Sequence, residues 1–374
     1  MLQYIARRLL LLVPTFVGIT FIGFAIIHLA PGDPVELFFA GGLAAGQGGI
    51  STQKLGDVEK AKAELRHELG LDQPIPIQYA RWLGRLVRAD LGTSLKDRQP
   101  VWEKIRPRLP VTITIASISL LIMYAFAIPL GIYSAVRPDT RLDRFLTAAI
   151  FMQYSVPSFW LGVLLIVYFC GGDYFNWFPP GGLRSLEYSA DWPLGQRLGD
   201  LSYHLVLPIF VTTLGSYTEL SRYMRSAMLE NARQDFIRTA RAKGVPERTV
   251  IFKHMLRNSL IAMVTIVAGV LPSMIGGSVI IEKMFSIPGI GQLGYQAVLA
   301  RDYPVVLALF ATSSFLTLVG ILLADLALAL VGWAVTEGAP GGFTEVPWPQ
   351  IGASLVMLQI FTATVPTFQA SWSL

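Results

Sequence analysis

Residues 111–136 read VTITIASISLLIMYAFAIPLGIYSAV and contain no charged side chain. A helix of about 20 such residues crosses a hydrocarbon core about 30 Å thick. Five further segments have the same apolar character and lie at about 9–29, 145–170, 203–223, 259–282 and 304–332. The sequence therefore predicts an all-α polytopic membrane protein with about six transmembrane helices.

The composition agrees with this class and argues against several others. Hydrophobic residues make up 53% of the 374 residues and charged residues 15%, whereas soluble domains average about 25% charged residues. The net charge of +5 is too small to indicate a nucleic-acid-binding protein. The single cysteine, Cys170, excludes an internal disulfide.

The first 29 residues resemble a secretory signal peptide only in part. Their apolar stretch continues to Leu29, which is longer than the roughly 7–15 residues of a typical signal h-region. No A-x-A-like cleavage site precedes Pro31. We therefore interpret 1–29 as an N-terminal segment and a retained first transmembrane helix.

Basic residues cluster in the short loops, and this clustering predicts the orientation. Arg7 and Arg8 precede the first span, arginines fill the 137–144 loop, and many Lys and Arg residues lie between 222 and 257. Short cytoplasmic loops of membrane proteins carry an excess of Lys and Arg. We therefore expect a multi-pass membrane protein with its N-terminus in the cytoplasm.

The long loop 30–110 then lies outside the cytoplasm. Helices are expected at 57–70, with Asp57 as N-cap and Gly70 as the residue after the helix, and at 77–89, where apolar positions recur at helical spacing. These helices could form a small extracytoplasmic cap, or a connector packed on the spans. A core of five transmembrane helices is expected at 111–332, followed by a tail at 333–374.

Motifs of common enzyme classes are missing. No Gly-Lys pair occurs, so the chain has no G-x-x-x-x-G-K-[ST] phosphate loop, and it has no H-E-x-x-H motif. The 4 histidines show no metal-ligand spacing. Glu219 and Asp325 fall near the cytoplasmic ends of spans, where snorkelling or pairing with a loop arginine explains them. We predict no enzymatic activity, cofactor or metal in this chain.

The loop 224–258 reads MRSAMLENARQDFIRTARAKGVPERTVIFKHMLRN between two apolar spans. Residues 226–243 are rich in helix-forming types. Gly244 can end that helix in a left-handed conformation, and Pro246 fits the first position of a second helix with Glu247 in its first turn. The sequence predicts a helix, a tight corner and another helix.

One face of the first helix carries Phe236, Thr239, Ala240 and Lys243 at helical spacing. Small side chains at 239 and 240 would let another protein approach the backbone closely, while flanking arginines pair with its acids. The alternative is an amphipathic helix on anionic lipid headgroups. Arg, Thr and Ala interrupt the apolar face that such a helix needs, which favours protein docking.

This loop resembles the EAA loop, E-A-A-x3-G-x9-I-x-L-P, of binding-protein-dependent ABC importer permeases of the dipeptide, oligopeptide and nickel branch. Ala240, Gly244 and Leu256 match the general pattern, and TARAKG and KHMLRN match the branch's own form. Similar segments follow in family order from 1 to about 330: ARRLLLLVPTF, HLAPGDPVE, GLDQPIPIQYARWL, ADLGTSL, RLPVTITIA, SVPSFWLGVLLI, HLVLPIF, EKMFSIPGIGQLGYQAV and RDYP. The segment GGDYFNWFPPGGL is similar to the subgroup that imports microcin C and oligopeptides.

The resemblance implies a type I importer fold, a location in the bacterial cytoplasmic (inner) membrane, and a permease that imports peptides, with nickel chelates or glycosides as alternative substrates. It also implies three kinds of protein partner besides the lipid bilayer: cytoplasmic ABC ATPases, a second related permease and an extracytoplasmic substrate-binding protein. The residues expected to couple to the ATPase are Phe236, Arg238, Thr239, Ala240, Arg241, Lys243, Gly244, Pro246, Glu247, His254 and Leu256.

Two features depart from the family pattern. Gly320 replaces the usual Asn of the last span, and the Asp-Pro-Arg ending is missing. The tail beyond 332 contains no Lys or Arg, so it is interpreted as appended, or as a seventh membrane-embedded segment near 351–366. A secondary transporter is the competing function, but such proteins typically show internal repeats and midplane charges, and neither is evident here.

Overall fold

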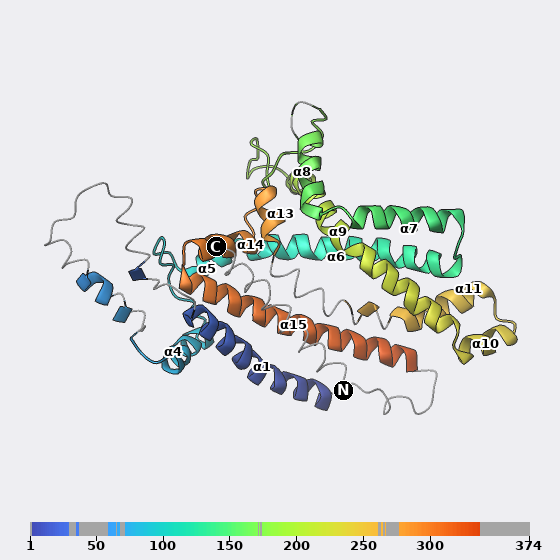
Figure 1. Cartoon of the computed structure of the whole chain (residues 1–374), viewed down its shortest axis with the longest axis horizontal. Coiled ribbons are helices and arrows are strands. Elements are labelled where there is room, and N and C mark those ends of the chain that lie inside the picture. Colours follow the sequence, from blue (N-terminus) through green and yellow to red (C-terminus); the bar gives the residue numbers. More distant parts are fainter. Residues whose placement is uncertain are drawn as a thin grey trace. The chain divides into compact units, whose positions relative to one another are not determined.

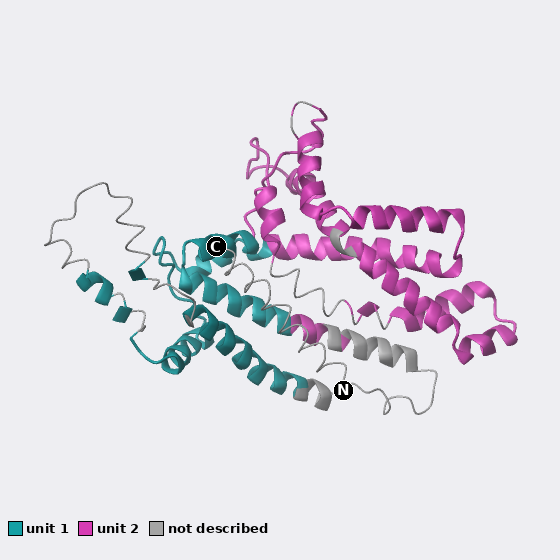
Figure 2. Cartoon of the chain, viewed as in Figure 1, with its two compact units in different colours: residues 1–110, 290–318 teal, residues 111–289, 319–374 magenta. Residues whose placement is uncertain are grey.

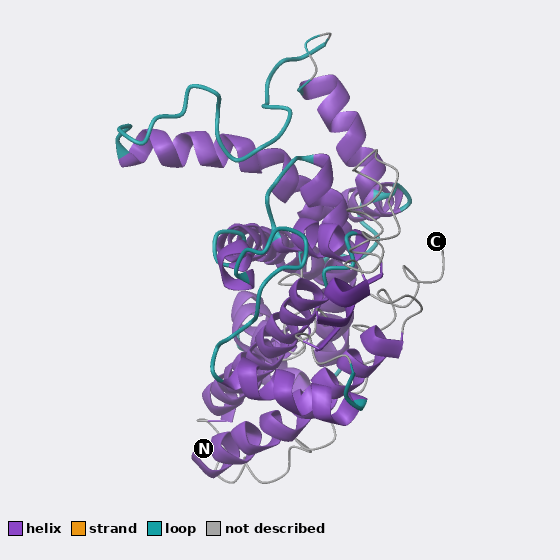
Figure 3. Cartoon of the chain, turned by 90° about the vertical axis from the view of Figure 1, so that its left-hand side faces the viewer, coloured by secondary structure: helices purple, strands orange, loops and turns teal. Residues whose placement is uncertain are grey.

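The computed structural model describes residues 2–29, 35–36, 59–64, 66–67, 72–170, 172, 174–260, 263–264, 266 and 277–336. Throughout these residues the chain consists of helices joined by turns and loops, and its β pairing is limited to an isolated bridge between Thr93 and Pro100 (Figure 3). The all-α prediction is therefore confirmed for the described part of the chain.

Three continuous helices are long and apolar enough to cross a membrane. They are α1 (Leu2–Leu29), α6 (Leu109–Val136) and α15 (Tyr303–Thr336), as labelled in Figure 1. Two bent helix pairs raise the number of candidate spans among the described residues to five. Most of the span expected at 259–282, and the tail from 337 onward, lie outside the described residues.

The span expected at 145–170 consists of two helices at an angle of 91°, α7 (Arg141–Tyr154) and α8 (Ser158–Phe169). The break falls at Pro157, which cannot donate a backbone hydrogen bond and disfavours helical geometry at Val156 before it. Pro157 is the residue that precedes α8, with φ −57° and ψ 131°. At the other end, the Thr140 hydroxyl caps α7 by accepting a bond from the Asp143 amide at 3.2 Å.

The span expected at 203–223 is the central part of the longer helix α9 (Leu194–Ala232), which bends by 49° between Leu214 and Tyr217. It begins directly after Pro193, its N-cap residue, and proline suits a helix start because the N–H that it lacks would have no intrahelical partner there. Its last turns run beyond the apolar segment into the basic loop. Helix α9 therefore continues, past the bend, from a candidate membrane span to the candidate site.

The chain divides into two compact units, shown in different colours in Figure 2. Unit 1 comprises Met1–Pro110 and Ile290–Leu318, and unit 2 comprises Val111–Gly289 and Val319–Leu374. In unit 1, α1 packs against α4 (Ile75–Val87) through the aromatic side chains of Phe24, Tyr79 and Trp82. Helix α4 is the helix expected at 77–89, whereas only 59–64 and 66–67 of the expected helix 57–70 are described, and they are helical.

A second core of unit 1 joins α5 (Val101–Ile105), α14 (Ile290–Leu299) and the start of α15. Beside it lies a buried polar cluster, here called the Asp302 network. The Asp302 carboxylate accepts hydrogen bonds from the Ser94 hydroxyl and, at 3.0 Å, from the Leu95 amide. Two segments of the predicted pattern, ADLGTSL and RDYP, are thereby joined although more than 200 residues separate them.

Lys104 completes the Asp302 network. Its ammonium group donates to the Ser94 hydroxyl at 2.8 Å and lies 2.8 Å from the Asp97 carboxylate and 4.0 Å from that of Asp302. Burial alone would raise the pKa of Asp97, but hydrogen bonds from Lys104 and Ser94 lower it below its usual value. The buried carboxylate of Asp302 is therefore held by hydrogen bonds and a nearby cation, as a buried charge requires, whereas Asp97 lies at the exposed edge of the network.

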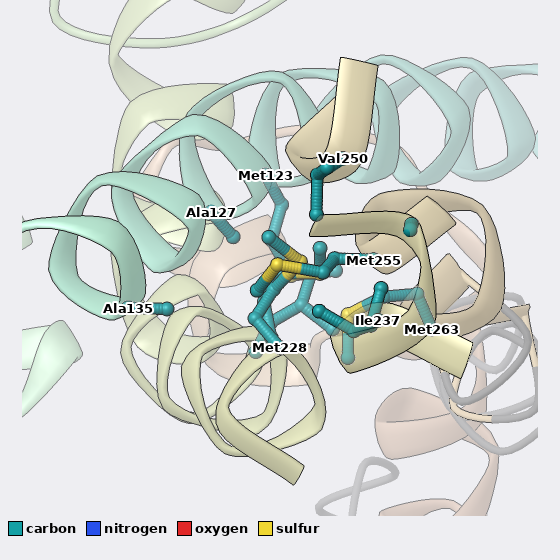
Figure 4. Packing of buried hydrophobic residues seen from close by; sticks show 11 residues of the cluster. Met123, Ala127, Ala135, Met228, Ile237, Val250, Met255 and Met263 are labelled. Atoms are coloured by element: carbon teal, nitrogen blue, oxygen red, sulfur yellow. The ribbon is translucent and has the colours of Figure 1, made fainter. Parts of the chain in front are cut away.

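Unit 2 contains α6 to α9 together with α10 (Asp235–Ala242), α11 (Glu247–Thr249), the π-helix η1 (Val250–Met255) and α13 (Val279–Met284). Helices α6 and α9 pack closely at Gly131, where an added Cβ would lie 2.7 Å from the Ser221 carbonyl oxygen. Beyond this contact, the side chains of Met123, Met228, Met255 and others point toward one another and form a core (Figure 4). Unbranched methionines suit such irregular junctions between helices.

Candidate functional site

The basic loop contains a compact hairpin of helices at residues 235–260, here called the basic corner. Figure 1 shows α10 and α11 at the end of α9. The sequence predicts one helix over 226–243, and this boundary is wrong. Helix α9 ends at Ala232, Gln234 is extended with φ −72° and ψ 150°, and α10 starts at Asp235. The break turns α10 back, which buries Ile237 in the methionine-rich core.

Gly244 forms the turn at the tip of the basic corner, as predicted. Its φ is +75°, a left-handed conformation that side-chain-bearing residues rarely adopt. The Gly244 amide donates to the Arg241 carbonyl at 2.9 Å, and the Val245 amide donates to the Ala240 carbonyl at 3.2 Å. These two bonds form a Schellman motif, and Val245 packs on the same core as Ala240.

The second helix begins one residue later than predicted. Pro246 is the N-cap of α11, with φ −55° and ψ 137°, rather than its first helical residue. Its carbonyl accepts a hydrogen bond from the Thr249 amide at 2.8 Å. The helix continues as a π-helical turn over Val250–Met255 and as α-helix to residue 260. Such π turns are rare and are often found at functional sites.

Two of the arginines expected to meet a partner's acids have acidic neighbours within the basic corner itself. The Arg241 guanidinium donates two bonds to Glu247, at 2.6 and 3.2 Å. This contact holds the pKa of Glu247 below its ordinary value and raises the pKa of Arg241. Arg238 lies 3.4 Å from Asp235, with both side chains largely exposed. Arg241 therefore braces the turn, whereas the Arg238 contact is too exposed to hold it firmly.

The four residues predicted to share one face of the first helix do not all face outward: one is buried and three are exposed. Ala240 is buried against its own chain, so its small side chain admits the core of unit 2 rather than a partner, and the sequence interpretation of this residue was wrong. Phe236, Thr239 and Lys243 are exposed. Together with Arg238 they form the outward surface of α10.

His254 and Leu256 are half-buried on the second helix of the basic corner. The His254 carbonyl accepts a hydrogen bond from the Asn258 side chain at 2.9 Å, and Leu256 packs against the methionine-rich core. One further contact is not evident from the sequence: the Asn231 side chain at the end of α9 donates to Ser259 at 3.1 Å. This bond closes the base of the hairpin.

Sequence reasoning also missed an open groove of about 840 Å³ along the second helix. It is lined by Arg248, Thr249, Phe252, Lys253, Leu256, Arg257 and Leu260. The signal was present, because apolar residues recur at 252, 256 and 260 and basic residues at 253 and 257, at helical spacing. Among the described residues, no group of three or more His, Cys, Asp or Glu side chains could hold a metal ion.

Other basic residues of the loop contact the neighbouring 137–154 segment. Arg225 lies 3.9 Å from Asp143, and the Arg222 guanidinium lies 5.1 Å from the Phe151 ring centre. Two loops that the sequence assigns to the same side of the membrane are thus adjacent in unit 2.

Two families of transport-system membrane components match most of the chain. The model for the binding-protein-dependent transport system inner membrane component matches residues 127–336, a range that includes the whole basic corner. The model for the N-terminal part of such membrane components matches residues 1–116. The chain belongs to this family. The predicted membership is confirmed, and the chain is a membrane permease component of a transport system.

Several relatives are transport permeases. The oligopeptide transport system permease protein AppB of Bacillus subtilis is 38% identical over 332 residues, which are 88% of this chain and 98% of the relative. The inner membrane ABC transporter permease protein YejB of Escherichia coli O157:H7 is 37% identical, over 88% and 97% of the two chains. The dipeptide transport system permease protein DppB of Escherichia coli K12 is 36% identical, over 82% and 90%.

Proposed function

We propose that this permease imports peptides in an ATP-driven transporter and that its basic corner docks on a separate ATPase subunit. The names of relatives that transport oligopeptides and dipeptides support the substrate class. The absence of a phosphate-loop sequence supports an ATPase on another chain. A second related permease and an extracytoplasmic binding protein complete the proposed assembly.

The set of hydrogen bonds that holds the basic corner together is the observation that carries the proposal. Gly244 sets its turn, the Arg241–Glu247 pair braces the turn, and Asn231–Ser259 closes its base. A coupling element must move as a body if it is to pass on closure of an ATPase. An exposed loop without such constraints would bend instead.

The basic corner is also joined to the membrane helices by packing. Ile237, Val250 and Met255 belong to the same buried core as Met123 of α6 and Met224 of α9. Because packed interiors are dense and transmit displacement, movement of the corner shifts both helices. The exposed Phe236, Arg238, Thr239 and Lys243 would contact the ATPase, with its acids facing the cations.

In this proposal the basic corner and the N-terminus are cytoplasmic, and 30–110 is the extracytoplasmic loop. The permease core spans 111–332, with 224–258 as its coupling loop. The excess of Lys and Arg in the 222–257 loop supports this orientation.

The experiment compares Gly244→Val with Gly92→Val in the complete transporter reconstituted in vesicles. Gly92 is a matched control because its φ is +78° and, as at Gly244, no atom lies within 4 Å of an added Cβ. We expect both variants to insert, and Gly244→Val alone to weaken ATPase co-purification about tenfold and to lose ATP-driven peptide uptake. Normal uptake by Gly244→Val would contradict the docking proposal. Uptake without ATP, driven by a proton gradient, would reject the ABC importer.

A further inference from the structure

The second helix of the basic corner carries three exposed cations that the proposed ATPase surface on α10 does not use. Arg248, Lys253 and Arg257 have no ion-pair partner in the part of the chain that the structure describes. Cations without an ion-pair partner create a positive potential that attracts an anionic surface, such as a protein's acidic patch or lipid headgroups.

These cations border an apolar strip. Phe252 is 56% exposed and shares the groove with Leu256 and Leu260, while Arg248, Lys253 and Arg257 line its edges. The opposite side of the same helix is packed inward, with Val250, Met255 and Ser259 buried. An exposed aromatic ring between Lys and Arg side chains is the arrangement of helices that lie at a membrane surface.

The position of the groove along the chain points to lipid. The helix leads directly into the apolar segment 259–282, so hydrocarbon is expected to begin near Leu260. At about 1.5 Å per residue, Arg257 and Lys253 lie roughly 5 and 11 Å from Leu260 along the helix, and Arg248 roughly 18 Å. The headgroup layer of one leaflet is about 5–8 Å thick, and long basic side chains extend toward it.

We propose that Lys253 and Arg257, with Phe252 beside them, bind the phosphate of an anionic phospholipid in the cytoplasmic leaflet. Arg248 lies at the outer rim and contributes less. The bound headgroup holds the base of the basic corner at the membrane surface, next to the Asn231–Ser259 contact. This inference rests on the cytoplasmic orientation in the proposed function. In the combined proposal α10 contacts the ATPase, and the second helix of the basic corner contacts the lipid.

The test uses the complete transporter in vesicles of phosphatidylcholine alone or with phosphatidylglycerol. Each cation near an anionic surface contributes about fivefold in affinity. We expect ATP-driven uptake by the native protein to rise with phosphatidylglycerol. The double variant Lys253→Gln/Arg257→Gln should lose this rise and bind phosphatidylglycerol about 25-fold more weakly in native mass spectrometry, whereas Arg248→Gln should bind it at most about fivefold more weakly.

Arg81→Gln/Arg85→Gln is the matched control, because these two exposed cations have the same four-residue spacing on α4. This control should keep the response to phosphatidylglycerol. The inference is overturned if the native protein does not respond, if the double variant still responds, or if the double variant releases the ATPase in detergent without lipid. The last result would make the groove an ATPase contact. Failure of the Gly244→Val experiment would leave the lipid-binding measurement intact, so the two proposals fail separately.

Discussion

The basic corner and the Asp302 network both hold a turn with charged groups, but they do so in opposite surroundings. In the basic corner, Arg241 and Glu247 are six residues apart and retain 46% and 56% of their side-chain exposure. In the Asp302 network, Asp302 and Ser94 are 208 residues apart, and the Asp302 side chain is 3% exposed. Water screens the first pair, whereas the second must be satisfied entirely by protein groups.

The two turns obtain their stability from different sources. The basic corner is stabilised mainly by the backbone geometry at Gly244 and by the apolar packing beneath it. The exposed Arg241–Glu247 ion pair contributes only a little more. The Asp302 network relies on the carboxylate itself, because removing it would leave the Ser94 hydroxyl and the Leu95 amide without their buried acceptor. Three substitutions test this contrast, in decreasing order of expected effect on stability.

The largest effect is expected for Asp302→Ala. Removing one partner of a buried charge network destabilises proteins by about 3–5 kcal/mol, and Lys104 would lose one of its two nearby carboxylates. The measurement is the thermal unfolding midpoint of the purified protein in detergent. Glu36→Ala, which removes an exposed ion pair with Arg66 in the same unit, is the control and should lower the midpoint little. If both variants lowered the unfolding midpoint equally, the buried Asp302 carboxylate would matter no more than an exposed ion pair, contrary to this prediction.

An intermediate effect is expected for Gly244→Ala. A left-handed residue with a Cβ costs roughly 1–2 kcal/mol, and no atom near Gly244 adds a steric term. Gly92→Ala should cost a similar amount of folding free energy, since its φ of +78° is close to that of Gly244 and its surroundings are equally open.

Gly244→Asn should recover much of the stability lost in Gly244→Ala, because Asn tolerates the left-handed conformation. Thermal unfolding of the three variants measures the effect, and a loss at Gly244→Asn as large as at Gly244→Ala would argue against a purely conformational role.

The smallest effect is expected for Glu247→Gln, below about 1 kcal/mol because the pair is exposed. Arg241 holds the folded-state pKa of Glu247 below its unfolded value. The pair's contribution is therefore fully present above the unfolded pKa and disappears as pH falls through the folded pKa. The difference in unfolding midpoint between native protein and variant should shrink at acidic pH. A difference that grows on acidification would show that the carboxylate is not stabilised by Arg241.

Much of the fold follows from signals that act over a few residues. The apolar runs at 9–29, 111–136 and 304–332 predict α1, α6 and α15 because hydrocarbon admits only helices with satisfied backbone groups. The break at Pro157 was not predicted, because the sequence indicates one span over 145–170 and Pro129 lies inside the continuous helix α6. Gly244 predicts the turn of the basic corner because only its backbone accepts that geometry without strain.

Other features could not be read locally. The break at Gln234 occurs in a sequence of good helix formers, because burying Ile237 beside α6 and α9 outweighs helix propensity there. Helical periodicity places Ala240 and Thr239 on the same face of the first helix, but it does not predict which of the two side chains packs into the methionine-rich core. Burial is decided by the residues that arrive from elsewhere in the chain.

Hydropathy and backbone conformation are properties of neighbouring residues, so the membrane class, the helical segments and the turn at Gly244 can be predicted from the amino-acid sequence. The pairing of Arg241 with Glu247, the burial of Ala240 and the contact between Asp302 and Ser94 became known only from the folded chain. Each of these depends on contacts between residues that become neighbours only when the chain folds.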